Sequence, residues 1–104
     1  MVDVQTFREL AFSLPDVVEV PHFDRPSFRV KKKIFATYHP DTNRAMLKLP
    51  LPDQSVFCNY DNRIFYPVPG AWGAKGATYV ELSKVRKDMF RDALDVAYQG
   101  VITR

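Results

Sequence analysis

The sequence predicts an α+β fold in which an antiparallel sheet of about five strands carries an N-terminal and a C-terminal helix on one of its faces. Two patterns lead to this prediction. Apolar and polar residues alternate over short runs in the middle of the chain, as in half-buried strands. Both ends instead repeat apolar residues three and four positions apart, as in amphipathic helices. Packing both helices against one face of the sheet buries both apolar stripes.

The N-terminal helix is predicted to begin after Asp3, which is a favourable N-cap residue. Pro15 should end it after about three turns, because the residue before a proline is disfavoured in the helical region. Its apolar stripe comprises Val4, Phe7, Leu10, Ala11 and Leu14. A short strand is predicted over residues 17–20 and should stop at Pro21. Residues 22–26 are predicted to connect to the next strand without regular secondary structure.

The stretch from Pro26 to Pro50 is predicted to form a three-stranded meander, around which the rest of the chain is organised. Lysines occupy its first turn, and an Asp-Thr-Asn cluster behind Pro40 marks the second. The alternating residues are Phe28 and Val30 in the first strand, Ile34, Ala36 and Tyr38 in the second (with Phe35 on the opposite face), and residues 45–49 in the third.

Behind the meander, Leu51 and Pro52 are predicted to be the cap and the first position of a short helix. A strand over residues 63–68 should lie near an edge or an end, because Pro67 lacks the amide hydrogen that a central strand needs. A glycine-rich loop over residues 69–76 and a last strand over 78–82 follow. Ser83 is predicted to cap the final helix and Gly100 to end it. That helix has the apolar stripe Met89, Phe90, Ala93, Leu94, Ala97, Tyr98 and Val101.

Length and composition predict one soluble domain that spans residues 1–104, with 46% hydrophobic and 26% charged residues. No apolar run approaches the roughly 20 residues that cross a bilayer, and the N-terminus lacks a secretory pattern. We therefore expect a cytoplasmic protein without a membrane partner. Cys58 is the only cysteine, so an internal disulfide is impossible, as suits a reducing compartment. One cysteine and two histidines match no zinc spacing, and we expect no metal and no cofactor.

Charge is distributed unevenly along the chain, whose net charge is +3. The first 24 residues carry one basic and five acidic side chains, whereas residues 25–48 carry seven basic and one acidic. A one-sided basic field of this kind attracts polyanions. The meander is therefore the first place to look for a binding surface.

Catalytic patterns are absent from the sequence, and we expect no enzyme. His22 and His39 have no neighbouring nucleophile, and a structural role is the simpler reading for both. Cys58 lies among apolar residues, where cysteines usually serve packing. Gly73 and Gly76 do not form a phosphate-binding loop, because no Gly-Lys-Ser/Thr sequence follows and the segment precedes a strand.

Nucleic-acid binding has better support, since basic side chains contact phosphates and aromatic side chains stack on bases. A lysine triplet at a turn also serves as a solvated hairpin tip that discourages edge pairing. A lone tryptophan in a loop is more often a lid over the core, and we favour that role for Trp72. The candidate nucleic-acid-binding residues are Arg25, Arg29, Lys31, Lys32, Lys33, Asn43, Arg44, Lys48, Trp72 and Lys75.

An ordered set of short motifs resembles the MmcQ/YjbR family over nearly the whole chain. The resemblance implies a small bacterial single-domain protein with a frataxin-like (CyaY-like) α+β fold and a double-wing DNA-binding motif. Two departures concern Lys31-Lys32, where the family often has a glycine, and Ala77, where it commonly has an aromatic residue. The matching motifs are Leu14-Pro15-Asp16-Val17 with Glu19, Ser27-Phe28-Arg29-Val30, Lys33-Ile34-Phe35-Ala36, Leu47-Lys48, Gly70-Ala71-Trp72-Gly73 with Gly76, and Ala97-Tyr98.

Three hypotheses follow for the function. The first is a non-enzymatic protein that binds double-stranded DNA through the basic meander, and for which we favour a monomer. The second is a protein- or small-ligand-binding module that uses the face around Trp72, Tyr79 and Lys48. In the third, the basic tip only aids solubility.

Overall fold

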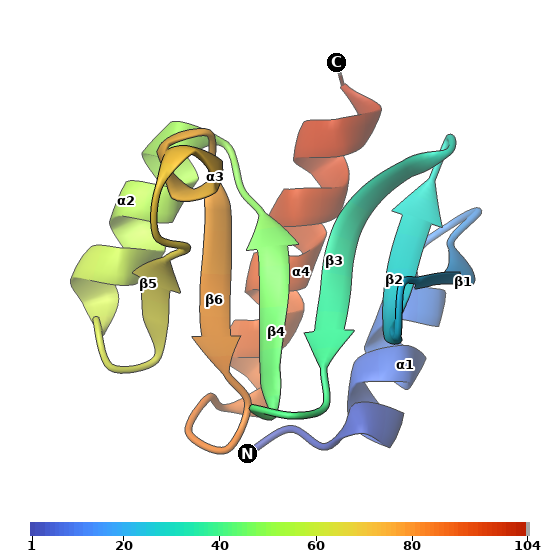
Figure 1. The fold of residues 1–104 in the computed structure, drawn as a ribbon, viewed down its shortest axis with the longest axis horizontal. Coiled ribbons are helices and arrows are strands. Elements are labelled where there is room, and N and C mark those ends of the chain that lie inside the picture. The colour runs from blue at the N-terminus through green and yellow to red at the C-terminus, as the bar shows by residue number, and fades with distance from the viewer. Residues whose placement is uncertain (104) are drawn as a thin grey trace.

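The computed structural model describes residues 1–103 as four helices and six strands in one antiparallel sheet (Figure 1). The strand order is β1-β2-β3-β4-β6-β5. The predicted α+β class is confirmed, with six strands in place of about five. The elements are α1 (Val4–Phe12), β1 (Val18–His22), β2 (Arg25–Val30), β3 (Lys33–His39), β4 (Arg44–Lys48), α2 (Leu51–Tyr60), β5 (Phe65–Pro67), α3 (Ala71–Ala74), β6 (Ala77–Glu81) and α4 (Lys87–Ile102).

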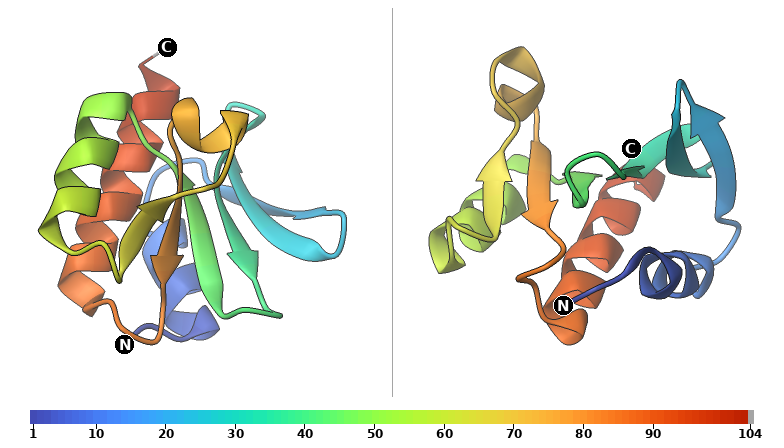
Figure 2. Two further views of the ribbon diagram at one scale, coloured as in Figure 1. Left: turned by 60° about the vertical axis from the view of Figure 1, so that its left-hand side comes forward. Right: turned by 60° about the horizontal axis from the view of Figure 1, so that its bottom comes forward.

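Helices α1, α2 and α4 lie on one side of the sheet and leave its other face uncovered (Figures 1 and 2). The core fills the space between them, as the paired apolar stripes predicted. The ring of Phe7 stacks on Phe28 with 4.9 Å between centroids and meets the edge of Phe90 at 5.0 Å. The Tyr98 hydroxyl donates to the Pro15 carbonyl at 2.7 Å and so ties α4 to the end of the α1 segment.

A β-bulge in β3 decides which side chains reach the uncovered face. Phe28 pairs with Ala36 and Arg29 pairs with Ile34, so Phe35 is the extra residue between them. Phe35 and Ala36 are therefore both buried. Strict alternation predicted Ile34 on the same face as Ala36, and that part of the prediction is wrong, because the bulge turns Ile34 to the uncovered face.

Strand β1 continues through Pro21 to His22 and pairs with β2, so the predicted stop at Pro21 is wrong. Since β1 is an edge strand, the missing amide hydrogen of a proline costs it no ladder bond. The predicted irregular segment is instead a two-residue hairpin turn, Phe23-Asp24. Strand β5 lies at the other edge, as Pro67 predicted.

Helix boundaries differ from prediction at three places. Asp3 caps α1 as predicted and accepts the amide of Thr6 at 2.7 Å. The N-cap of α2 is Pro50 and that of α4 is Arg86, so the predicted caps Leu51 and Ser83 are wrong. Gly100 lies inside α4, where a β-carbon would come within 2.9 Å of the Pro50 side chain.

The glycine-rich segment contains a helical turn, α3, which the sequence did not predict. A β-carbon on Gly73 would stand 1.8 Å from the Val68 carbonyl oxygen, so this packing requires glycine. The Gln54 side-chain amide also donates to the Gly73 carbonyl at 2.9 Å and to Thr78 Oγ1 at 3.1 Å. Helix α2 therefore holds α3 at the end of the sheet.

Gly70 and Gly76 permit a test of this packing, because both have a positive φ but only Gly76 is crowded. A β-carbon on Gly76 would lie 2.1 Å from the Leu49 carbonyl oxygen, whereas Gly70 has nothing within 4 Å. Gly70→Ala should cost about 1–3 kcal/mol, because its φ of 83° and ψ of −154° lie in a region that is essentially restricted to glycine. Gly76→Ala should cost about 1–3 kcal/mol more because of overpacking. Urea unfolding measures both, and equal losses would contradict the close approach of Gly76 to Leu49.

Candidate functional site

The sheet is curved, so that its two edges rise on either side of the central strands (Figure 2, right). We call its uncovered face the trough. A pocket of about 340 Å³ lies in it. We call it the open-face pocket. Ile34, Met46 and Tyr79 come from the central strands β3, β4 and β6. His22 and Arg25 line one side, from the β1–β2 hairpin, and the other side is lined by Val68 and Trp72.

Trp72 forms part of the pocket wall and does not cover the core. Its side chain is 69% exposed, so the favoured prediction of a lid is wrong. The reason lies in its neighbour: Gly73 packs against the Val68 carbonyl and accepts from Gln54. These contacts fix the inner side of α3 and leave Trp72 facing the trough. Glycine spacing in the sequence indicated an unusual backbone but not its orientation.

Tyr79 is held in place by a polar network at the pocket floor. The Arg44 guanidinium lies 3.9 Å from the centroid of the Tyr79 ring and donates to the Tyr66 hydroxyl at 3.1 Å. Tyr66 in turn donates to the Glu81 carboxylate. Burial and this carboxylate raise the pKa of the Tyr66 phenol. Arg44 therefore holds the Tyr79 ring in place. The sequence indicated Arg44 as a candidate nucleic-acid-binding residue, but its guanidinium is engaged within the protein.

His39 is a buried, neutral histidine beneath the pocket. Its Nε2 hydrogen-bonds to Thr37 Oγ1 at 3.0 Å, and its ring meets Tyr79 edge-on at 5.7 Å. Burial lowers the pKa of His39 from 6.5 to about 4, and the positive charges of Arg25 and Arg44 contribute to that shift. The structural role predicted for this histidine is consistent with these contacts.

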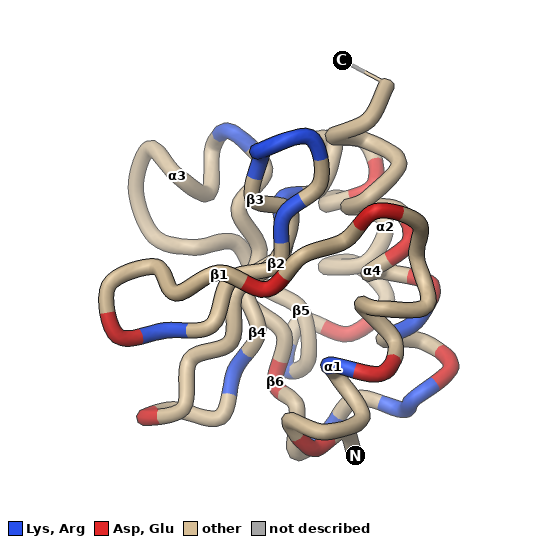
Figure 3. Tube along the Cα trace, turned by 90° about the vertical axis from the view of Figure 1, so that its right-hand side faces the viewer, with Lys and Arg blue, Asp and Glu red and all other residues tan. Residues whose placement is uncertain are grey.

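The basic residues predicted as one surface separate into two groups. Arg25, Asn43 and Arg44 belong to the strand ends on one side, whereas β4 runs to Lys48 at the other. The lysines of the β2–β3 turn stand at that second end, where Figure 3 shows the basic residues gathered (Figure 3). Lys75 joins them through its neighbour Gly76, whose carbonyl accepts from the Leu49 amide at 3.0 Å. We call this group the basic end; it comprises Arg29, Lys31, Lys32, Lys33, Lys48 and Lys75.

None of the six cations of the basic end forms an ion pair within residues 1–103. A second hollow of about 320 Å³ lies among Arg29, Lys32, Lys33 and Lys48. It shares His22, Ile34 and Lys48 with the open-face pocket. Apolar and cationic compartments therefore adjoin, and no carboxylate among the described residues lines either one.

Lys31 and Lys32 form a two-residue hairpin turn with φ values of 51° and 66°. Positive φ at both positions is the requirement of a type I′ turn, which strongly favours Asn-Gly. Lysine at such a position costs on the order of 1 kcal/mol. The chain therefore keeps two unpaired charges at a position where local conformation favours other residues.

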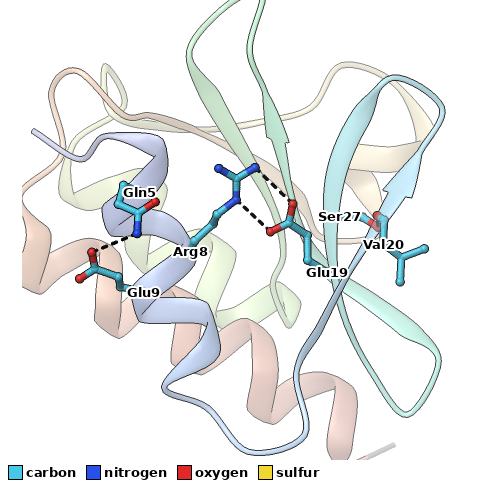
Figure 4. Close-up of polar contacts among 6 residues, drawn as sticks. All are labelled: Gln5, Arg8, Glu9, Glu19, Val20 and Ser27. Carbon is cyan, nitrogen blue, oxygen red and sulfur yellow. Dashed lines mark hydrogen bonds and ion pairs between the residues drawn. The ribbon is translucent and has the colours of Figure 1, made fainter.

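The β1–β2 hairpin that forms one wall of the trough is anchored to α1 by an ion pair. Arg8 Nε donates to Glu19 Oε1 at 2.9 Å and Arg8 Nη2 to Glu19 Oε2 at 3.2 Å (Figure 4). On the other face, the Ser27 hydroxyl donates to the Val20 carbonyl across the same hairpin. These contacts fix the hairpin that places His22 and Arg25 over the trough.

Other candidate sites carry little chemistry. Within residues 1–103, no three side chains of histidine, cysteine, aspartate or glutamate come together as metal ligands. Burial raises the pKa of the half-buried Cys58 thiol, which favours its unreactive protonated form. No helix in the described part of the chain is long and apolar enough to span a bilayer.

The chain is similar to a known protein family and to a solved structure. The model of the YjbR family matches residues 12–100. Among solved structures, the fold is similar to that of protein DR2400 from Deinococcus radiodurans, described with a DUF419 domain. The TM-score is 0.81 at 21% sequence identity, over 94% of this chain and 77% of DR2400. No curated protein matches the sequence.

The low pKa of His39 predicts how stability depends on pH. The unfolded chain binds a proton at His39 below pH 6.5, whereas the folded protein does so only near pH 4. The neutral histidine therefore contributes stability that is fully present above pH 6.5 and is lost as the pH falls toward 4. Relative to His39→Gln, the wild type should lose on the order of 2 kcal/mol over this range. Urea unfolding at pH 7 and pH 4 measures the difference, and a constant value would contradict a buried neutral His39.

Proposed function

This chain belongs to the YjbR family, and we propose that it is a non-enzymatic, cytoplasmic protein that binds double-stranded DNA. The basic end carries this activity by contacting the phosphates of the duplex. Phosphate contacts position a protein on DNA without reading its sequence. We therefore expect binding that is sensitive to salt and only weakly selective for sequence.

The strained lysine turn is the observation that supports this proposal most. Lys31 and Lys32 have positive φ values, are exposed and form no ion pair within the described residues. A turn selected for stability alone would favour asparagine and glycine here. Strain that persists at an exposed position indicates a function for the side chains. Charges at the tip of a hairpin are also well placed to approach a phosphate backbone.

The remaining candidate residues have separate roles in this proposal. Arg29, Lys33, Lys48 and Lys75 extend the cationic surface behind the tip, and each contact adds to the salt dependence. Arg25, Asn43 and Arg44 lie at the opposite strand ends and do not extend it. Trp72 faces the trough and is not needed for phosphate contact.

The proposal of a non-enzymatic role has chemical support. The imidazole of His39 hydrogen-bonds to Thr37, and His22 packs against Phe23 with 4.8 Å between ring centroids. The raised pKa of Cys58 weakens it as a nucleophile. Within the described residues, the one hydroxyl bonded to these groups, that of Thr37, is buried. The proposed role is therefore binding.

Replacing Lys31 by Asn and Lys32 by Gly separates binding from stability. The double variant should be more stable by about 1 kcal/mol, because Asn-Gly fits the turn. It should bind DNA more weakly, and its plot of log affinity against log salt should be shallower by roughly 1.8, or about 0.9 for each lost contact. Fluorescence anisotropy with a labelled random duplex at about 50 and 200 mM salt measures binding. Urea unfolding measures stability.

Lys84→Gln combined with Lys87→Gln is the matched control. It also removes two exposed charges, but these follow the C-terminal end of β6, whereas Lys75 precedes its N-terminal end. This variant should keep the wild-type salt dependence. Equal losses in both double variants would indicate a response to net charge alone. No wild-type binding at the lower salt would reject duplex DNA as the ligand and leave the basic end a solubilising tip.

A further inference from the structure

We propose that the open-face pocket and the cationic hollow beside it together bind one small phosphorylated compound with a planar aromatic group, of the class of nucleoside diphosphates. This proposal goes beyond the DNA binding proposed above: it uses the trough together with four cations that also belong to the basic end, whereas DNA binding is led by the tip of the β2–β3 hairpin. Its support comes from the shape, the side chains and the charges of the trough.

The open-face pocket provides the apolar compartment. Its volume of about 340 Å³ is at the small end of the range for ligand pockets, roughly 300–1,000 Å³. Ile34, Met46 and Val68 contribute aliphatic surface, and Trp72 and Tyr79 contribute two aromatic rings. An exposed tryptophan beside an apolar hollow is the usual partner of a planar group, because stacking buries its ring.

The ring of Tyr79 is fixed before any ligand arrives. Arg44 covers it at 3.9 Å, His39 meets it edge-on at 5.7 Å, and Tyr66 lies 5.8 Å away. A side chain that is already immobile loses little entropy when a ligand binds. The network of Arg44, Tyr66 and Glu81 thus prepares the floor of the pocket and explains why Arg44 is internally engaged.

The adjoining hollow provides the anionic compartment. Four cations line it, Arg29, Lys32, Lys33 and Lys48, and no acidic side chain of the described residues lies among them. One carboxylate would leave most of this charge unbalanced, whereas a diphosphate offers several negative charges and many acceptor oxygens. Phosphate is therefore the anion that complements this compartment.

Shared residues indicate that one molecule occupies both compartments. His22, Ile34 and Lys48 line the pocket and the hollow alike. Inorganic phosphate would use only the cations, and a neutral aromatic compound would use only the apolar pocket. A nucleoside diphosphate uses both. Burial is the main cause of the low pKa of His39, and the positive charges of Arg25 and Arg44 at this face add to it.

Binding is tested with adenosine diphosphate, adenosine and pyrophosphate as probes. Trp72 is the only tryptophan, so its fluorescence reports occupation of the pocket directly, and calorimetry gives the affinity. Adenosine diphosphate should bind at least about tenfold more tightly than adenosine or pyrophosphate, because only it fills both compartments.

Two substitutions remove the compartments separately. Trp72→Ala should weaken adenosine diphosphate binding roughly 5- to 150-fold, the range for one lost stacking partner. Lys33→Gln should weaken it and bring its affinity nearer to that of adenosine, because Lys33 lines only the cationic hollow. Tyr60→Ala is the control, because Tyr60 is an exposed aromatic residue on α2 that lines neither hollow. It should bind like the wild type.

Some results would overturn the proposal. Pyrophosphate binding as tightly as adenosine diphosphate, or a Trp72→Ala variant with unchanged affinity, would show an ordinary cation cluster. A single-stranded oligonucleotide that binds far more tightly than adenosine diphosphate would replace the small molecule as the occupant. Lys31 lines neither hollow, so Lys31→Gln should weaken DNA binding only, and Trp72→Ala should weaken nucleotide binding only. Failure of either activity is thus separately visible.

Discussion

Two consecutive side chains of β3, Phe35 and Ala36, are both buried against the helices, and the β-bulge that permits this sets up the opposite face. Without the bulge, Ile34 would point into the core and Phe35 would stand on the uncovered face. With it, Ile34 becomes part of the floor of the trough and pairs with Arg29, which lines the cationic hollow. One extra residue therefore serves core packing and also brings an apolar and a basic surface together.

Local conformation is least favourable at the turns around the trough. Four of the five non-glycine residues with positive φ in the described chain belong to hairpin turns: Phe23, Lys31, Lys32 and Asn43. Asparagine tolerates this region, but phenylalanine and lysine do not. Phe23 is also 90% exposed, so neither burial nor backbone preference accounts for it. The best-packed side chains face the helices, and two of these unfavourable choices, Lys31 and Lys32, lie at the basic end.

Sequence patterns predicted the parts of the fold that depend on local signals. The N-cap at Asp3, the apolar stripe of α4 and the edge position of Pro67 follow from propensity and periodicity, and the structure confirms them. The bulge at Phe35 and the pairing of β1 through Pro21 depend on tertiary contacts, which have no local signature. For the candidate site, too, the sequence predicted only the local part, which is the position of Lys31 and Lys32 at a turn. The engagement of Arg44 with Tyr66 and the outward position of Trp72 required knowledge of strands that are distant in sequence.

The two proposed activities are coupled through charge. Lys48, Lys32 and Lys33 belong to the basic end and also line the cationic hollow. An anion held there would neutralise part of the field that attracts a phosphate backbone, and each cation withdrawn lowers both the affinity and its salt dependence. Because coupling between two binding sites is reciprocal, DNA at the basic end would lower the affinity for the small anion by the same factor. Of the two turn lysines, only Lys32 lines the hollow, so an anion bound there would neutralise Lys32 and not Lys31. The position of the shared lysines therefore makes this face of the sheet a surface on which a small phosphorylated ligand and a nucleic acid would compete.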